Sequence, residues 1–219
     1  RFMGISTGAS IVVSQHFGAR DRDRLSRTVG VTVWLTLLSG GLMMVVGAAA
    51  AKPLLMLLDT PAEMLDLAND YLFIIMLGMP FLTMYNILSG VLRGMGDSVS
   101  PLVYLLVASL LNIVLDLAFV TLLGMTTDGV ALATVIAQSV SAFLGLNKLR
   151  RMKKTLDFGW HTLRMDREIA SRIVRLGLPA GMTQMIFSLS SILVQSLTNS
   201  FGAAFVACNT IVMRVDSFV

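Results

Sequence analysis

The chain has 219 residues, of which 55% are hydrophobic and only 14% carry a charge, and its formal net charge is +4. A soluble domain has about a quarter charged residues. The charges here are bunched, and they leave apolar runs of about twenty residues, the length that an α-helix needs to cross a bilayer. This composition excludes an ordinary soluble domain and predicts an all-α polytopic membrane protein built as a helical bundle.

The hydrophobic pattern predicts seven membrane-spanning helices. The sequence opens at Arg1 without an initiator methionine or a visible signal peptide, and we expect a fragment whose first and last spans continue beyond its ends. In chain order, the predicted spans are residues 2–17, 29–51, 67–89, 101–123, 130–146, 176–199 and 203–219.

Basic residues are distributed unevenly over the loops between these spans. Four lie in loop 18–28, one in loop 90–100 and nine in loop 147–175, whereas the three alternate loops together hold only Lys52. The positive-inside rule therefore predicts that loops 18–28, 90–100 and 147–175 are cytoplasmic. The positive charge is explained by membrane topology and nearby anionic headgroups, without a nucleic-acid partner.

The longest loop ends in a stretch that predicts a short interfacial helix. This stretch, MDREIASRIVRLG, begins near Asp166, a good N-cap residue, and its apolar side chains fall on one side of a helix with arginines around the rest. Two interpretations remain open: a solvated linker helix, or a helix that binds lipid in a regulatory role.

The sequence contains no motif for enzymatic chemistry. It has neither G-x-x-x-x-G-K-[ST] for ATP phosphates nor H-E-x-x-H for a metal, and the GMG at 94–96 is too short for a dinucleotide site. The single cysteine, Cys208, cannot form an internal disulfide. His16 and His161 lie in or beside predicted loops, where a surface role is favoured over metal ligation. We expect neither an enzyme nor a cofactor or metal site.

The fourth predicted span carries an amide and a carboxylate in the middle of an apolar run, SLLNIVLDLAFVTLLG. Asn112 and Asp116 are four residues apart, so they share one face of a helix. Asp116 is fifteen residues from Pro101, or roughly 22 Å at 1.5 Å per residue, which places it in the half of the membrane away from the cytoplasm. A charged aspartate costs roughly 2.5–3.5 kcal/mol at mid-helix. Because desolvation disfavours the charged form of a carboxyl, such a group is suited to proton exchange and ion coupling. The alternative is an interhelical hydrogen-bond pair that only fixes packing.

Further polar residues in the spans are candidates for the same pocket or for a substrate cavity. Asn86 lies late in the third span, and Thr134 and Gln138 are four residues apart in the fifth. Each alone is more often a helix–helix hydrogen bond than a ligand, but with Asp116 they would form one polar pocket. Arg214 and Asp216 in the last span either face a cavity or pair with helices that this chain lacks.

Several ordered segments give the chain a family resemblance. MPFLTMYNILSGVLRGMGDSVSP, LLNIVLD and GVALATVIAQ follow one another as in the multidrug and toxin extrusion (MATE) family. GASIVVSQHFGARD resembles that family's second helix with the loop after it, and GLPAGM resembles the start of its seventh helix. Any one segment is a weak signal, but their ordered succession is specific and covers essentially the whole chain.

The resemblance implies an architecture. Family members have twelve helices in two six-helix lobes with a substrate cavity between them, so the seven spans would be helices two to eight. Residues 1–146 would then be N-lobe helices without the first, residues 147–175 the cytoplasmic connector between lobes, and residues 176–219 the first helices of the C-lobe. The missing helices of the same chain would be its structural partners.

The resemblance also implies site residues, through the DinF-type branch of the family. In that branch a proton site combines an aspartate of the first helix, Asn-x-x-x-Asp of the fifth and polar residues of the fourth and sixth. Asn112 and Asp116 match the fifth-helix pair, Asn86 the fourth-helix amide and Thr134 the sixth-helix hydroxyl. The span 176–199 carries Gln184, a candidate for the substrate cavity, but lacks the glutamate of the sodium-coupled branch.

These matches imply an antiporter in the plasma membrane that exports cationic, amphipathic drugs or toxins in exchange for H⁺, or for Na⁺. A lipid-linked oligosaccharide flippase of the same superfamily is the first alternative, but it calls for a cationic cavity, and among the predicted spans only Arg214 would supply a positive charge. A non-transporting membrane scaffold is the second, and it would leave Asn112 and Asp116 without a role.

Overall fold

The computed structural model describes residues 3–57, 62–152, 156 and 166–200, and every element in them is a helix. Five helices are long and apolar enough to cross a membrane, which confirms the expected all-α membrane architecture. The last predicted span, with Arg214 and Asp216, lies outside the described residues. In chain order the elements are α1 (Met3–Gly18), α2 (Arg22–Leu57), α3 (Ala62–Gly94), α4 (Val99–Leu117), the π-helical turn η1 (Ala118–Leu122), α5 (Thr127–Arg151) and α6 (Arg167–Ser200).

Aspartates start two of the long helices. The backbone N–H of Arg24 donates to Asp21 Oδ1 (3.0 Å) in the first turn of α2. Asp166 Oδ1 accepts from the backbone N–H groups of Glu168 (3.0 Å) and Ile169 (3.4 Å) at the start of α6. These bonds satisfy N–H groups that have no partner within the helix.

The GMG segment ends α3. Gly96 has φ +86°, a left-handed conformation that glycine adopts without steric cost. The N–H of Asp97 donates to Leu92 O (2.9 Å) and the N–H of Gly96 to Arg93 O (3.0 Å), the hydrogen-bond pair of a Schellman cap. These glycines therefore terminate a helix and turn the chain toward α4.

α6 begins earlier than the sequence pattern indicates. The residues expected to form a separate interfacial helix are the first turns of α6, which runs from Arg167 to Ser200 without interruption. The connector is shortened at its other end too, because α5 continues to Arg151.

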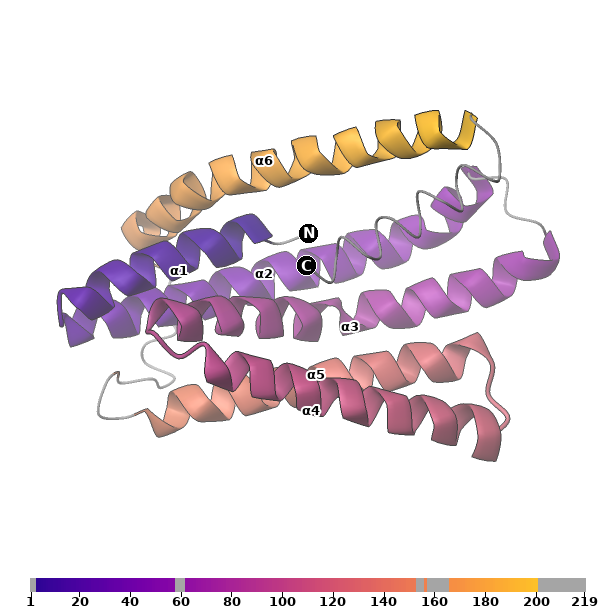
Figure 1. Cartoon of the computed structure of the whole chain (residues 1–219), viewed down its shortest axis with the longest axis horizontal. Coiled ribbons are helices and arrows are strands. Elements are labelled where there is room, and N and C mark those ends of the chain that lie inside the picture. The colour runs from indigo at the N-terminus through magenta and orange to yellow at the C-terminus, as the bar shows by residue number, and fades with distance from the viewer. Residues whose placement is uncertain (1–2, 58–61, 153–155, 157–165, 201–219) are drawn as a thin grey trace.

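α3 lies at the centre of the bundle (Figure 1). It packs against α1, α2 and α5, while α4 packs mainly on α5 and α6 runs along α1. In Figure 1, α6 and the α4–α5 pair lie on opposite sides of the bundle. The main core cluster joins α1, α2, α3 and α5 and contains Val13, Val29, Leu88, Val91 and Leu149, all fully or almost fully buried.

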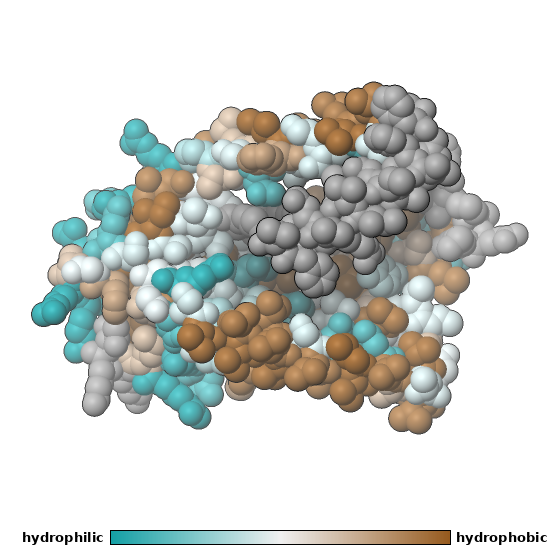
Figure 2. Space-filling view, in the orientation of Figure 1, coloured by the Kyte–Doolittle hydropathy of each residue, from teal (hydrophilic) through white to brown (hydrophobic). Residues whose placement is uncertain are grey.

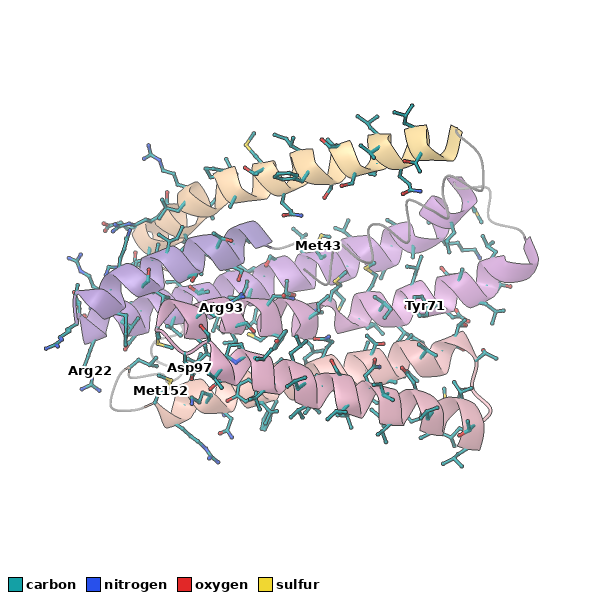
Figure 3. The ribbon with its side chains drawn as sticks, in the orientation of Figure 1. Arg22, Met43, Tyr71, Arg93, Asp97 and Met152 are labelled. Atoms are coloured by element: carbon teal, nitrogen blue, oxygen red, sulfur yellow. The ribbon has the colours of Figure 1, made fainter. Side chains whose placement is uncertain are left out.

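Loops 18–28 and 90–100 lie at one end of the bundle, as do the end of α5 and the start of α6, which flank the longest basic loop (Figure 1). Figure 3 shows Arg22, Arg93, Asp97 and Met152 together at this end, with Tyr71 toward the other. Figure 2 shows hydrophilic side chains gathered at the same end and apolar ones along the outer surface of α4. Lys148 Nζ lies 3.3 Å from Asp97 Oδ2, so an ion pair ties the α3–α4 loop to α5. This end is called the basic end below.

Candidate ion-coupling site

Asn112 and Asp116 lie on the last turns of α4, four residues apart on one face of that helix. Both are half-buried, whereas their neighbours Ile113, Val114 and Leu117 are exposed. α4 packs on α5, so the polar pair lies along the α4–α5 contact while the apolar neighbours cover the outer surface.

A hydrogen bond joins this pair to α5. Asn112 Nδ2 donates to Thr134 Oγ1 across 3.5 Å, and the Thr134 hydroxyl in turn donates to Val130 O (2.9 Å). Because α4 and α5 are antiparallel neighbours joined by a short loop, residues far apart in sequence meet at one level. The structure thus brings together three of the four residues expected at the ion site: Asn112, Asp116 and Thr134.

Asp116 is the unusual member of the group. Its Oδ1 atom is buried and accepts no hydrogen bond from any described residue, and the same is true of Oε1 of Gln138, one turn beyond Thr134 on α5. A buried acceptor without a partner costs about 1–3 kcal/mol, more for a charged group. Two buried oxygen atoms, Asp116 Oδ1 and Gln138 Oε1, therefore remain available as acceptors. A proton, a cation or a hydrogen-bond donor of a ligand would satisfy them.

Asp128 is a residue that the sequence analysis missed. It lies in the first turn of α5, and its Oδ1 is also buried without a hydrogen-bond partner in the described part of the chain. The signal was present in the TTDG segment, but an acidic residue between two spans is ordinarily a solvated loop residue. Its burial depends on how the α4–α5 hairpin closes.

The helix changes its pitch directly after Asp116. Residues Ala118–Leu122 form a π-helical turn, and the backbone N–H of Met125 donates to Phe119 O (3.0 Å) where the chain leaves it. Such turns are rare and recur at functional sites. Neither proline nor glycine occupies this turn, so the sequence gives no local signal for it.

Asn86 and Gln184 form no hydrogen bond with this group in the described part of the chain. The exposed side-chain amide of Asn86 donates to Leu82 O of its own helix (2.8 Å), and the main-chain carbonyl of Asn86 accepts from Ser6 Oγ (3.0 Å). Gln184 is half-buried on α6, on the opposite side of the bundle from α4. Arg214 and Asp216 lie outside the described residues. Among the described residues, no cluster of three or more His, Cys, Asp or Glu side chains is suited to a metal ion.

A second polar region lies at the basic end, where α6 meets α1. Arg172 Nη2 donates to Gln15 Oε1 (2.9 Å), which joins the start of α6 to the end of α1. Beside this bond is a cavity of about 160 Å³ between α1, α2 and α6. Its lining residues are His16, Arg24, Arg27, Asp166, Glu168, Ile169 and Arg172.

Comparison with known proteins decides the family. The family model described as MatE matches residues 2–118, more than half of the chain. The chain belongs to the MATE family. It is 33% identical to the probable multidrug resistance protein YoeA of Bacillus subtilis (strain 168), over 99% of this chain and 48% of that protein. It is 27% identical to DNA damage-inducible protein F of Escherichia coli (strain K12), over 99% of this chain and 47% of that protein.

Solved MATE structures agree in fold. A MATE crystal structure in the bent conformation superposes with a TM-score of 0.90 at 27% identity, over 99% of this chain and 49% of that one. The expected family resemblance is confirmed. The chain spans about half the length of the curated relatives it matches.

Proposed function

We propose that this chain is part of a secondary antiporter that exports cationic, amphipathic drugs or toxins in exchange for protons. MATE family members are transporters rather than enzymes. YoeA, which matches this chain, is described as a probable multidrug resistance protein. The observation that carries the proposal for this chain is the buried, unpartnered Oδ1 of Asp116 beside the hydrogen bond between Asn112 and Thr134.

Asp116 couples the two fluxes in this proposal. When Asp116 is ionised, its negative charge favours binding of a cationic substrate in the central cavity. Protonation from the outer side removes that charge, and the hydrogen bonds around Asn112 rearrange, which weakens substrate binding. Proton and substrate then compete for one carboxylate, and rocking of one lobe against the other provides alternating access.

The direction of transport follows from a proposed orientation. We place the basic end, with loops 18–28, 90–100 and 147–175, in the cytoplasm of a cell whose plasma membrane the helices span. Arg22 and Arg93, which belong to two of these loops, lie at the same end of the bundle (Figure 3), and this supports the orientation. Asp116 then lies toward the outer half of the membrane, where it is reached by external protons.

Drug resistance of cells that express the complete protein tests the proposal. Asp116→Asn keeps the shape of the side chain but removes its titration, and should abolish resistance at unchanged expression. The matched control is Asp70→Asn, which alters an exposed carboxylate on α3 and should leave resistance intact. Full resistance in the Asp116→Asn variant would remove the basis for the coupling site.

A further inference from the structure

An apolar groove on the outside of the bundle has no role in the proposed antiport. It has a volume of about 460 Å³, within the range of roughly 300–1,000 Å³ typical of small-molecule sites. It lies between α2, α3 and α5. Its lining residues are Leu37, Pro80, Phe81, Met84, Ser139, Val140, Ala142, Phe143 and Leu146.

The groove results from how α3 and α5 touch. A Cβ on Gly78 would lie 2.4 Å from the Val135 side chain, and one on Gly145 would lie 3.1 Å from Leu88, so the helices approach closely at two levels. Between these levels the groove has a buried floor of Met84 and Ala142. The rim is exposed, with Leu37 at 50%, Phe81 at 44% and Phe143 at 67%. The groove is therefore closed below and open at the surface of the bundle.

The groove faces away from the candidate ion site. Phe143 and Thr134 are nine residues apart on α5, which is two and a half turns, so they lie on opposite faces of that helix. Met84 and Asn86 are two residues apart on α3, so their side chains also point in nearly opposite directions from that helix. The groove surface is thus separate from the residues of the antiport proposal.

The chemistry of the lining calls for an apolar occupant. Ser139 supplies the single side-chain polar group among the lining residues, and its hydroxyl donates to Val135 O of its own helix (2.7 Å). The remaining side chains are hydrocarbon, aromatic or thioether. A ligand that needed hydrogen bonds inside the groove would lose those it makes with water.

A positively charged residue, Arg150, lies beyond the groove in the direction of the basic end. On α5 the lining residues Phe143 and Leu146 lie seven and four residues before Arg150, so Arg150 falls on the same face of the helix, one turn beyond the groove. Arg150 is exposed, whereas nearby Lys148 pairs with Asp97. Arginine near a helix end extends to the headgroup level and binds phosphate well.

We propose that this groove binds one acyl chain of an anionic glycerophospholipid from the leaflet at the basic end, with the lipid phosphate at Arg150. The apolar lining excludes the headgroup from the groove, and the register of Arg150 places a positive charge where the headgroup emerges. One basic side chain near a membrane surface favours an anionic lipid by about fivefold.

Lipid binding to the complete, delipidated protein tests this site by native mass spectrometry. Phosphatidylglycerol is titrated against phosphatidylcholine with the same acyl chains, and the wild type should retain the first phosphatidylglycerol about fivefold more tightly. Arg150→Gln should abolish that preference. The matched control is Arg151→Gln, which removes an equal charge on another face of the same helix end. Both arginines are exposed, so neither substitution threatens folding.

A second variant tests the groove itself. Ser139→Leu fills the space and should weaken retention of both lipids, with a matching loss of lipid-induced thermal stabilisation. Equal retention of the two lipids by the wild type would show non-selective lipid only and overturn the proposal. So would equal losses in the two arginine variants, or unchanged retention in Ser139→Leu. These readouts do not involve transport, so this site and the antiport proposal succeed or fail separately.

Discussion

Gly177 of α6 lies against Gly4 of α1 so closely that a Cβ on Gly177 would stand 2.3 Å from the Gly4 carbonyl oxygen. Gly8 repeats this one turn along, where a Cβ would stand 2.2 Å from Ile173 O. Small residues let membrane helices pack backbone to backbone. The family resemblance assigns α1 to the N-lobe and α6 to the C-lobe, and under that expected assignment this crossing is a contact between the lobes.

Gly177→Ala should therefore destabilise the complete protein by about 1–3 kcal/mol, because backbone atoms must move to admit the methyl group. Thermal unfolding in detergent measures the effect. The control is Gly41→Ala on α2, where an added Cβ meets no atom within 4 Å, and it should be neutral or slightly stabilising. Equal stability of the two variants would contradict the close crossing.

The hydrogen bond from Arg172 to Gln15 holds the start of α6 against the end of α1, so these two helices are closed together at the basic end in this conformation. A cysteine pair at these positions, in a Cys208→Ser background, should form a disulfide or accept a short cross-linker. In the proposed alternating-access cycle the cross-link should stop transport, because it would keep α1 and α6 together at that end. Reduction should restore activity. Rapid transport by the fully cross-linked protein would show that the contact stays closed throughout the cycle.

Asp97 predicts a pH dependence of stability. Burial raises the pKa of its carboxyl, but hydrogen bonds from the Ser100 hydroxyl and N–H together with the Lys148 ammonium hold that pKa below its usual value. A group with a lowered pKa stabilises the folded state above its unfolded pKa of about 3.9 and loses this contribution as pH falls through the folded pKa.

Asp97→Asn should accordingly lower thermal stability at neutral pH, by up to about 1 kcal/mol for a partly exposed ion pair. The difference between variant and wild type should shrink below about pH 4. Unfolding temperatures of both proteins across this pH range measure it. A constant difference at every pH would show that the charge of Asp97 does not matter.

The Asn112–Thr134 hydrogen bond predicts coupling between two substitutions. A double-mutant cycle with Asn112→Ala and Thr134→Val should give an interaction free energy of about 0.6 kcal/mol in unfolding, the average for such bonds between membrane helices. Thr36→Val is the control partner, because the Thr36 hydroxyl donates to Thr32 O within α2. Additivity in both cycles would mean that the bond contributes nothing.

Much of this molecule follows from local sequence signals. Five of the predicted spans are helices long and apolar enough to cross a bilayer, whereas the first predicted span corresponds to α1, which has 16 residues and is not among them. The meeting of Asn112, Asp116 and Thr134 follows from two facts: four-residue spacing aligns side chains on one face, and a short loop makes α4 and α5 antiparallel neighbours.

Features that depend on packing were not visible in the sequence. The burial of Asp128 and the π-helical turn after Asp116 arise where the hairpin closes, and no residue type marks either. The groove between α2, α3 and α5 depends on two close helix contacts, at Gly78 and Gly145. The sequence does not show which helix packs against each of these glycines, so it does not predict the groove. The early start of α6 was hidden because arginines in its first turns resemble an interfacial segment.

The proposed coupling role of Asp116 is tested most directly by substrate efflux from proteoliposomes that contain the complete protein. The wild type should drive efflux of a cationic dye when a pH gradient is imposed and not when a Na⁺ gradient of equal size replaces it. Asp116→Asn should lose the gradient-driven component while the purified protein remains folded. Efflux that follows the pH gradient equally well in the Asp116→Asn protein would contradict the account.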